Sequence, residues 1–209
     1  MLTLAIDSAS EACSVAMFDG AVLIAGSYRV LGRGHAEHLV PMIAELPNNG
    51  RADRIAVSLG PGSFTGVRVG IAAARALAFA WNAELAGFPT LALIAAMAQA
   101  LRPGQPATIV TTGGHGEWFV QDFDAAGAAT TELASMPPDE AANRGGADLV
   151  AGNQAEALVE RRGWGTAIAV LPDARQLDLL PGSAFLDTVA PLYGRPPDAR
   201  LPDSAGRRG

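Results

Sequence analysis

The sequence contains no lysine, and all fifteen of its basic residues are arginine. This absence excludes a Walker-type nucleotide loop, a Schiff-base enzyme and a serine–lysine dyad, because each of these requires a lysine side chain. The single cysteine, Cys13, cannot form a disulfide within the chain, which is typical of proteins in a reducing compartment. We therefore look for function in other residue types.

Long hydrophobic runs are also missing. The longest nearly apolar stretch, 87–101, is interrupted by Pro89, Thr90 and Gln99 and is too short to cross a bilayer. The first twenty residues include three acids and lack the basic start of a signal peptide. We expect a cytoplasmic protein without membrane attachment.

What the sequence does contain is a large apolar share. Its 209 residues are 49% hydrophobic and 17% charged, with a formal net charge of −6. This composition is too apolar for disorder, and the length suits one large domain or two of roughly 100 residues. The net acidity argues against a dedicated nucleic-acid binder, although it does not exclude a role beside RNA.

Hydrophobic periodicity predicts an α/β fold. In the first half we expect strands at 2–6, 12–18, 21–29, 55–59 and 85–87, and helices at about 35–46, 65–81 and 90–101. In the second half we expect strands at 107–111, 117–123, 130–136, 148–151 and 167–170, and a helix at 154–161. Two prolines and a glycine in 102–106 mark a domain boundary. The predicted units are therefore an N-terminal lobe at 1–102, a C-terminal lobe at 107–195 that repeats its order of elements, and a solvated tail at 196–209.

A glycine-rich loop joins the predicted strand at 55–59 to the helix at 65–81. Gly60, Gly62 and Ser63 could present backbone amides and a helix N-terminus to an anion or nucleotide, with Asp7 and Ser8 at the end of the first strand beside them. Neither complete phosphate-binding pattern is present, however. A tight strand-to-helix turn explains the same glycines.

The helix at 65–81 carries small residues at every fourth position, namely Gly66, Gly70, Ala74 and Ala78. This spacing places them on one stripe. Because glycine inside a helix costs about 1 kcal/mol relative to alanine, the stripe indicates a close approach by another backbone. The stripe could pack on the protein's own sheet. We favour contact with another subunit, since larger apolar residues on the other faces could serve the core.

Catalytic and metal-binding patterns are weak. His35 and His38 could begin a metal site, but the HExxH pattern is absent and only His115 remains as a third histidine. Neither Ser58 nor Ser63 lies in a nucleophile elbow. We therefore predict no catalytic residue, no metal ligand and no stably bound cofactor.

Several segments resemble the bacterial TsaB (YeaZ) family. The resemblance rests on the residues at 4–8, 34–41 and 87–93, on PLYGRP at 191–196, and above all on GPGSFTGVRVG at 60–70. It is dense over the first hundred residues and sparse beyond them. It implies a two-lobed fold of the actin, Hsp70 and sugar-kinase (ribonuclease H-like) type.

The resemblance also implies a function. TsaB-like proteins are accessory subunits in the synthesis of threonylcarbamoyladenosine beside the tRNA anticodon. They dock on the catalytic paralogue TsaD, are joined by the small ATPase TsaE, and form a homodimer when alone. The complex uses ATP, a nucleotide could lie at a subunit junction, and tRNA is met only through the complex. The two docking helices map to 35–46 and 65–81, so the expected partner-binding residues are His35, His38, Leu39, Met42, Gly66, Val67, Gly70, Ala73, Ala74 and Leu77.

The sequence departs from the family pattern in two places. The link at 47–54 is short, and 112–118 does not match the family's usual residues at the first hairpin of the second lobe. An alternative function stays open at this point: a stand-alone enzyme of the same superfamily, either a small-molecule kinase or a metallopeptidase of the glycoprotease type.

Overall fold

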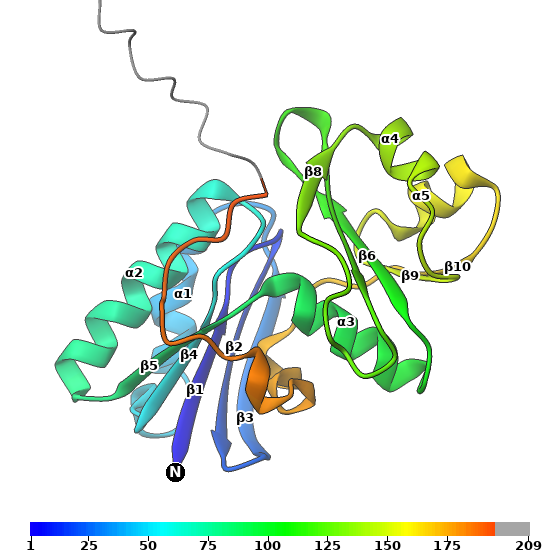
Figure 1. The fold of residues 1–209 in the computed structure, drawn as a ribbon. Coiled ribbons are helices and arrows are strands. Elements are labelled where there is room, and N and C mark those ends of the chain that lie inside the picture. The colour runs from blue at the N-terminus through cyan, green and yellow to red at the C-terminus, as the bar shows by residue number, and fades with distance from the viewer. Residues whose placement is uncertain (195–209) are drawn as a thin grey trace, which may run out of the picture.

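The computed structural model describes residues 1–194, which form two domains (Figure 1). Each domain is built on a five-stranded mixed sheet, with strand orders β3-β2-β1-β4-β5 and β10-β9-β6-β7-β8. The predicted α/β fold with two mixed sheets flanked by helices is confirmed. The predicted tail at 196–209 lies outside the described residues.

The first domain begins with an antiparallel meander of three strands, followed by two strands parallel to β1. Its elements lie within a few residues of the predicted limits, because the alternation of the strands and the periodicity of the helices are both strong here. They are β1 (Leu2–Asp7), β2 (Ala12–Asp19), β3 (Val22–Val30), α1 (His35–Ala44), β4 (Arg54–Ser58), α2 (Phe64–Trp81), β5 (Glu84–Phe88) and α3 (Thr90–Leu101).

The second domain repeats this topology in shorter elements: β6 (Ala107–Thr112), β7 (Trp118–Phe123), β8 (Ala134–Met136), α4 (Pro138–Asn143), β9 (Leu149–Ala151), α5 (Ala155–Arg162) and β10 (Thr166–Ile168). Two expectations were wrong. The strand predicted at 130–136 is reduced to three residues, and the short helix α4 was not predicted. Pro138 occupies the first turn of α4, where its missing N–H costs no hydrogen bond.

The elements stack in five layers. On one face of the first sheet lie α1 and α2, whose side chains Leu39, Met42 and Ile71 share a core with β1 and β2. Beyond the second sheet lie α4 and α5, which contribute Ala141 and Leu158 to another core. Between the two sheets lies α3 (Figure 1).

The two domains share α3 and the C-terminal segment 173–194, which crosses back after β10 and is called the returning segment. Leu93 of α3 packs into the first domain, whereas Leu91 and Ile94 pack against β6 and β7 of the second. After β10 the chain crosses back, where the Ala174 amide donates to Ser14 Oγ at 2.9 Å. The proposed limits 1–102 and 107–195 stay a prediction, but the contacts of 173–192 lie mainly on the first sheet.

Among the described residues, α2 is the one helix whose length and composition would also suit a membrane span. Its inner face is nevertheless occupied, because Val67, Ile71 and Ala74 are buried against the first sheet. Phe79, on the opposite face, is 91% exposed.

Candidate binding cleft and partner face

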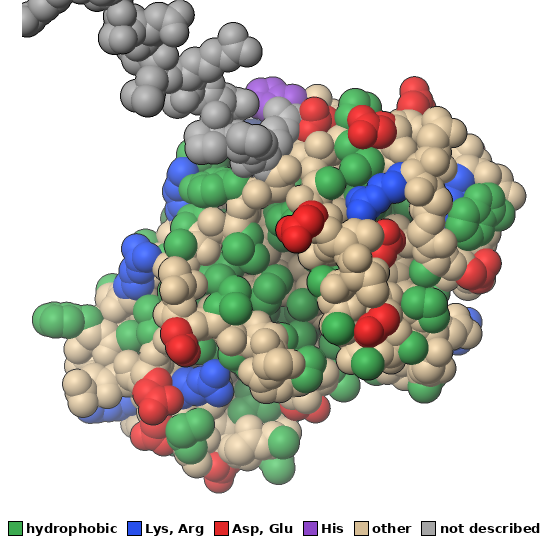
Figure 2. Space-filling view, viewed as in Figure 1, with side chains coloured by type: hydrophobic (Ala, Val, Ile, Leu, Met, Phe, Trp, Pro, Cys, Tyr) green, Lys and Arg blue, Asp and Glu red, His purple; other side chains and the backbone are tan. Residues whose placement is uncertain are grey.

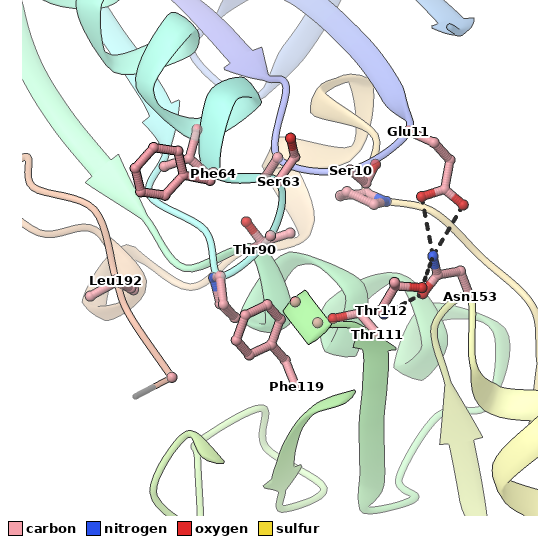
Figure 3. Close-up of a pocket in the computed structure, with 18 of the residues that line it drawn as sticks. Ser10, Glu11, Ser63, Phe64, Thr90, Thr111, Thr112, Phe119, Asn153 and Leu192 are labelled. Atoms are coloured by element: carbon pink, nitrogen blue, oxygen red, sulfur yellow. Dashed lines mark hydrogen bonds between the residues drawn. The ribbon is translucent and has the colours of Figure 1, made fainter. Parts of the chain in front are cut away.

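A cavity of about 720 Å³ lies between the two domains. Figure 2 shows the molecule hollowed between the domains, with hydrophobic side chains along the hollow. Thr90 and Ile94 of α3 contribute to its wall, and Figure 3 shows Phe64 and Phe119 reaching it from the two domains. Its ionisable side chains are Glu11, Arg68, His115 and Tyr193.

The glycine-rich loop forms one wall of this cavity. Pro61, Gly62 and Ser63 line it, whereas Gly60 does not. The Ser63 amide donates to the Ala9 carbonyl at 2.7 Å, and a Cβ at Gly62 would overlap that same carbonyl oxygen. Ser63 Oγ accepts a hydrogen bond from the Gly66 amide at 3.2 Å and so caps α2. The close-packed turn therefore accounts for Gly62 without a bound anion.

Asp7 does not reach the cavity. Its side chain is fully buried, and Oδ1 accepts from the Ala9 amide at 3.0 Å, while Oδ2 has no hydrogen-bond partner among the described residues. Burial raises the pKa of Asp7 to about 6, against the opposing effect of the Ala9 hydrogen bond and of the nearby Ser58 hydroxyl. Ser8 is also turned inward and donates to the Gly66 carbonyl at 2.9 Å. In this arrangement neither residue is available to a ligand in the cleft.

Residues that the sequence analysis missed bridge the cleft. Asn153, between β9 and α5, donates from Nδ2 to both carboxylate oxygens of Glu11, each at 3.1 Å. On the first domain, the Arg68 guanidinium lies 3.3 Å from the centre of the Phe64 ring and donates to the Tyr193 hydroxyl at 3.0 Å. These residues are far apart in the sequence, so no local pattern could bring them together.

The histidines do not form a cluster. His35 is buried with Nε2 3.2 Å from the Ala12 carbonyl oxygen, and His38 is exposed on α1. His115 lies in the other domain, on the loop 112–118, and lines the cavity. Within residues 1–194 there is no group of three or more His, Cys, Asp or Glu side chains that could hold a metal ion.

The predicted partner stripe on α2 faces the wrong way. Gly66, Gly70 and Ala74 are buried against the first sheet. A Cβ at Gly66 would overlap the Ser8 carbonyl oxygen, and one at Gly70 would lie 2.5 Å from Ser8 Oγ. The backbone that approaches the glycines is therefore the protein's own.

The other predicted partner residues divide in the same way. Leu39, Met42 and Val67 belong to the core, and His35 is buried beside it. Ala73 and Leu77 are half-buried, and His38 alone of the ten is exposed. The assignment of the buried residues to an interface is thus corrected, because helical spacing identifies a face without showing which neighbour it contacts.

A second small-residue face lies on the solvent side of α2. Ala72, Ala76 and Ala80 recur every four residues and are exposed, with Phe79 beside them. The neighbouring helix α1 adds exposed Val40, Pro41 and Ala44. Both helices cover the same face of the first sheet (Figure 1), so the two exposed surfaces are neighbours. We call this set of residues the outer helical face.

The duplicated topology around a central cleft defines the class: the two-domain fold of actin, Hsp70 and the sugar kinases. The ethanolamine utilization protein EutJ from Carboxydothermus hydrogenoformans shares this fold, with a TM-score of 0.52 and 12% identity over 87% of this chain and 90% of EutJ. A family model described as TsaD: tRNA N6-adenosine threonylcarbamoyltransferase matches residues 29–178. The chain belongs to this family.

Within the family, the chain is similar to proteins named TsaB, as the sequence segments predicted. It is 38% identical over 100 residues to the tRNA threonylcarbamoyladenosine biosynthesis protein TsaB of Escherichia coli and 42% identical over 106 residues to that of Haemophilus influenzae. Each alignment covers 46% of this chain, and 43% and 42% of the respective relatives, so it spans less than half of their length.

Two solved structures match over nearly the whole chain. YeaZ from Pseudomonas aeruginosa has a TM-score of 0.77 at 27% identity, covering 92% of this chain and 99% of YeaZ. A structure from the same organism, described as similar to peptidase YEAZ, has a TM-score of 0.78 at 28% identity, covering 93% and 99%. The predicted resemblance is confirmed.

Proposed function

We propose that this chain is a non-catalytic accessory subunit that supports a TsaD-type paralogue in forming threonylcarbamoyladenosine in tRNA. The relatives named TsaB are described by their part in this biosynthesis. The outer helical face is the observation that carries the proposal of a subunit role. It presents alanines, Val40 and the 91%-exposed Phe79 from two adjacent helices to solvent.

The shape of the outer helical face suits a helical partner. Alanines at four-residue spacing leave a shallow groove along α2, which lets another helix approach closely. Arg75 flanks this groove on the side of the returning segment, where it donates to the Val189 carbonyl at 2.6 Å, and Arg68 lies one turn before Ala72 at the end of the groove. The partner would therefore bury an apolar strip bordered by charge, as protein interfaces commonly do.

The side chains of the cleft favour a supporting role over catalysis. Asp7, at the end of β1, is buried in the core, and Glu11 is held by Asn153. Arg68 is stacked on Phe64 and bonded to Tyr193. None of these groups pairs a nucleophile with a base in the way that hydrolysis requires.

The remaining parts of the proposal follow from the family. The complex would include a TsaE-like ATPase and use ATP, with any nucleotide held at a subunit junction rather than stably by this chain. Without its paralogue the chain would form a homodimer over the outer helical face. It would act in the cytoplasm and meet tRNA only through the complex, in keeping with its net charge of −6.

The test places a charge in the middle of the outer helical face. Ala76→Arg should abolish co-purification with the co-expressed TsaD-type paralogue. An arginine that is buried in the interface without a partner costs several kcal/mol of binding free energy, which lowers the affinity by about a hundredfold or more. Ala100→Arg, at an exposed position on α3, is the matched control and should bind normally.

Two results would contradict the proposal. One is that Ala76→Arg binds the paralogue as well as the control Ala100→Arg does. The other is ATP turnover or peptidase activity of the purified chain alone, which would instead support the stand-alone enzyme.

A further inference from the structure

The cavity between the domains is bounded by two polar bridges in addition to α3. On one side, the Leu192 amide donates to the Leu59 carbonyl at 2.8 Å and the Ser135 amide donates to the Gly194 carbonyl at 3.1 Å. The returning segment thus joins the first domain to the second. On another side, the bridge consists of side chains alone, from Glu11 and Asn153 (Figure 3).

Asn153 is held in one orientation by its own domain. Its Oδ1 accepts the Thr112 amide at 2.9 Å, so Nδ2 must point the other way, toward Glu11. A main-chain N–H can only donate, which settles the orientation of the side-chain amide. Gly152 allows this turn, because it has φ +121° and a Cβ there would overlap the Val110 carbonyl oxygen. The donor is therefore fixed before the domains meet.

The position of Glu11 is fixed by main-chain hydrogen bonds within the first domain. Its main-chain carbonyl accepts the amides of Leu31 and Gly32, both at 2.9 Å, which ties the turn between β1 and β2 to the end of β3. Its carboxylate makes no ion pair among the described residues, and Asn153 is its hydrogen-bond partner there. A charged acceptor strengthens a hydrogen bond, so this contact outweighs an ordinary neutral pair.

We propose that Glu11 and Asn153 form a latch that holds the two domains closed over the cavity on this side. When the latch is released, the domains remain joined by α3 and the returning segment, and the cleft opens at the Glu11 edge. The latch is independent of the outer helical face and of the proposed accessory role, because it acts between the domains of one chain.

Exchanging donor and acceptor gives a sharp test. Asn153→Asp keeps the acceptor for the Thr112 amide but sets a carboxylate against Glu11, so the like charges should open the cleft. Glu11→Gln combined with Asn153→Asp restores a donor–acceptor pair in the opposite sense. Hydrogen exchange of the cavity-lining amides at 9–11 and 111–114 measures the opening.

We expect at least tenfold faster exchange at these amides in Asn153→Asp, and a return to within about threefold of the unmodified chain in the double variant. Asn49→Asp, an exposed substitution of the same type, should change nothing. Failure of the double variant to rescue Asn153→Asp would overturn the latch, since the effect would then not pass through Glu11. Glu11→Ala provides a second route should Asn153→Asp fail to fold: it should also speed exchange at 111–114, and unchanged exchange there would equally overturn the proposal.

Discussion

The two domains share one topology but differ in size and charge. The first has an 18-residue α2, whereas its counterpart α5 has eight residues. Between residues 1 and 106 there are seven acidic and seven basic side chains, but between 107 and 173 there are ten acidic and only three basic ones. The first domain thus has a long helix whose exposed side is available to a partner. The second domain is a smaller and more acidic copy.

The ends of their first strands sharpen this contrast. β1 ends at Asp7, which is fully buried, and β6 ends at Thr112, which is exposed and bonded to Asn153. The first domain therefore holds its strand-end polar group in the core, and the second domain presents its own to the cleft. The last residue of the first strand thus supports the core in the first domain and faces the cleft between the domains in the second.

The largest expected effect tests the inner face of α2. Gly70→Leu should destabilise the first domain by about 3 kcal/mol, the upper end of the usual overpacking cost, because its Cβ would press on Ser8 and Val57. The melting temperature should fall by roughly 6–12 °C at any protein concentration. Ala76→Leu, on the outer helical face, should leave it unchanged. A stable Gly70→Leu variant that fails to associate would restore the interface interpretation.

The next effect concerns the buried acid. Because the folded-state pKa of Asp7 is raised from 3.8 to about 6, its contribution to stability is fully present below pH 3.8 and is lost as pH rises through 6. Asp7→Asn should therefore stabilise the protein at pH 7.5 by about 2–3 kcal/mol relative to the unmodified chain, with no such gain at pH 4. Denaturant unfolding at both pH values measures this. An equal effect at both would show that the charge of Asp7 plays no part.

The smallest effect tests where the returning segment belongs. Arg175 pairs with Asp173 at 2.7 Å, and its guanidinium lies 5.2 Å from the ring centre of Tyr28 on β3. Arg175→Ala should cost about 1 kcal/mol and speed exchange along β3 rather than in the second domain. Faster exchange confined to β9 and β10 would assign the segment to the second domain instead.

The sequence predicts the first domain well because its strands alternate and its helices are long. In the second domain the three-residue strands β8, β9 and β10 carry too few residues for a period to be clear. The stripe on α2 shows a different limit. Gly66 and Gly70 on one side and Ala72 and Ala76 on the other have the same spacing, and only the position of Ser8 tells which side is the core.

The cleft could be predicted only in part. The loop containing Gly62 and Ser63 was identified, since glycine patterns are local. Glu11 and Asn153 are 142 residues apart, and neither stands in a recognisable motif. Asp7 was expected beside the glycine-rich loop as part of a possible anion or nucleotide site, but the depth of its burial depends on packing that no local pattern contains.

The position of α3 has a consequence for how the molecule unfolds. Its residues complete the cores on both of its sides, so neither domain can lose its structure without exposing apolar surface of the other. The two copies should therefore melt as one cooperative unit, with a calorimetric enthalpy equal to the van't Hoff value. The two copies of the fold are therefore separate domains in structure but a single cooperative unit in unfolding.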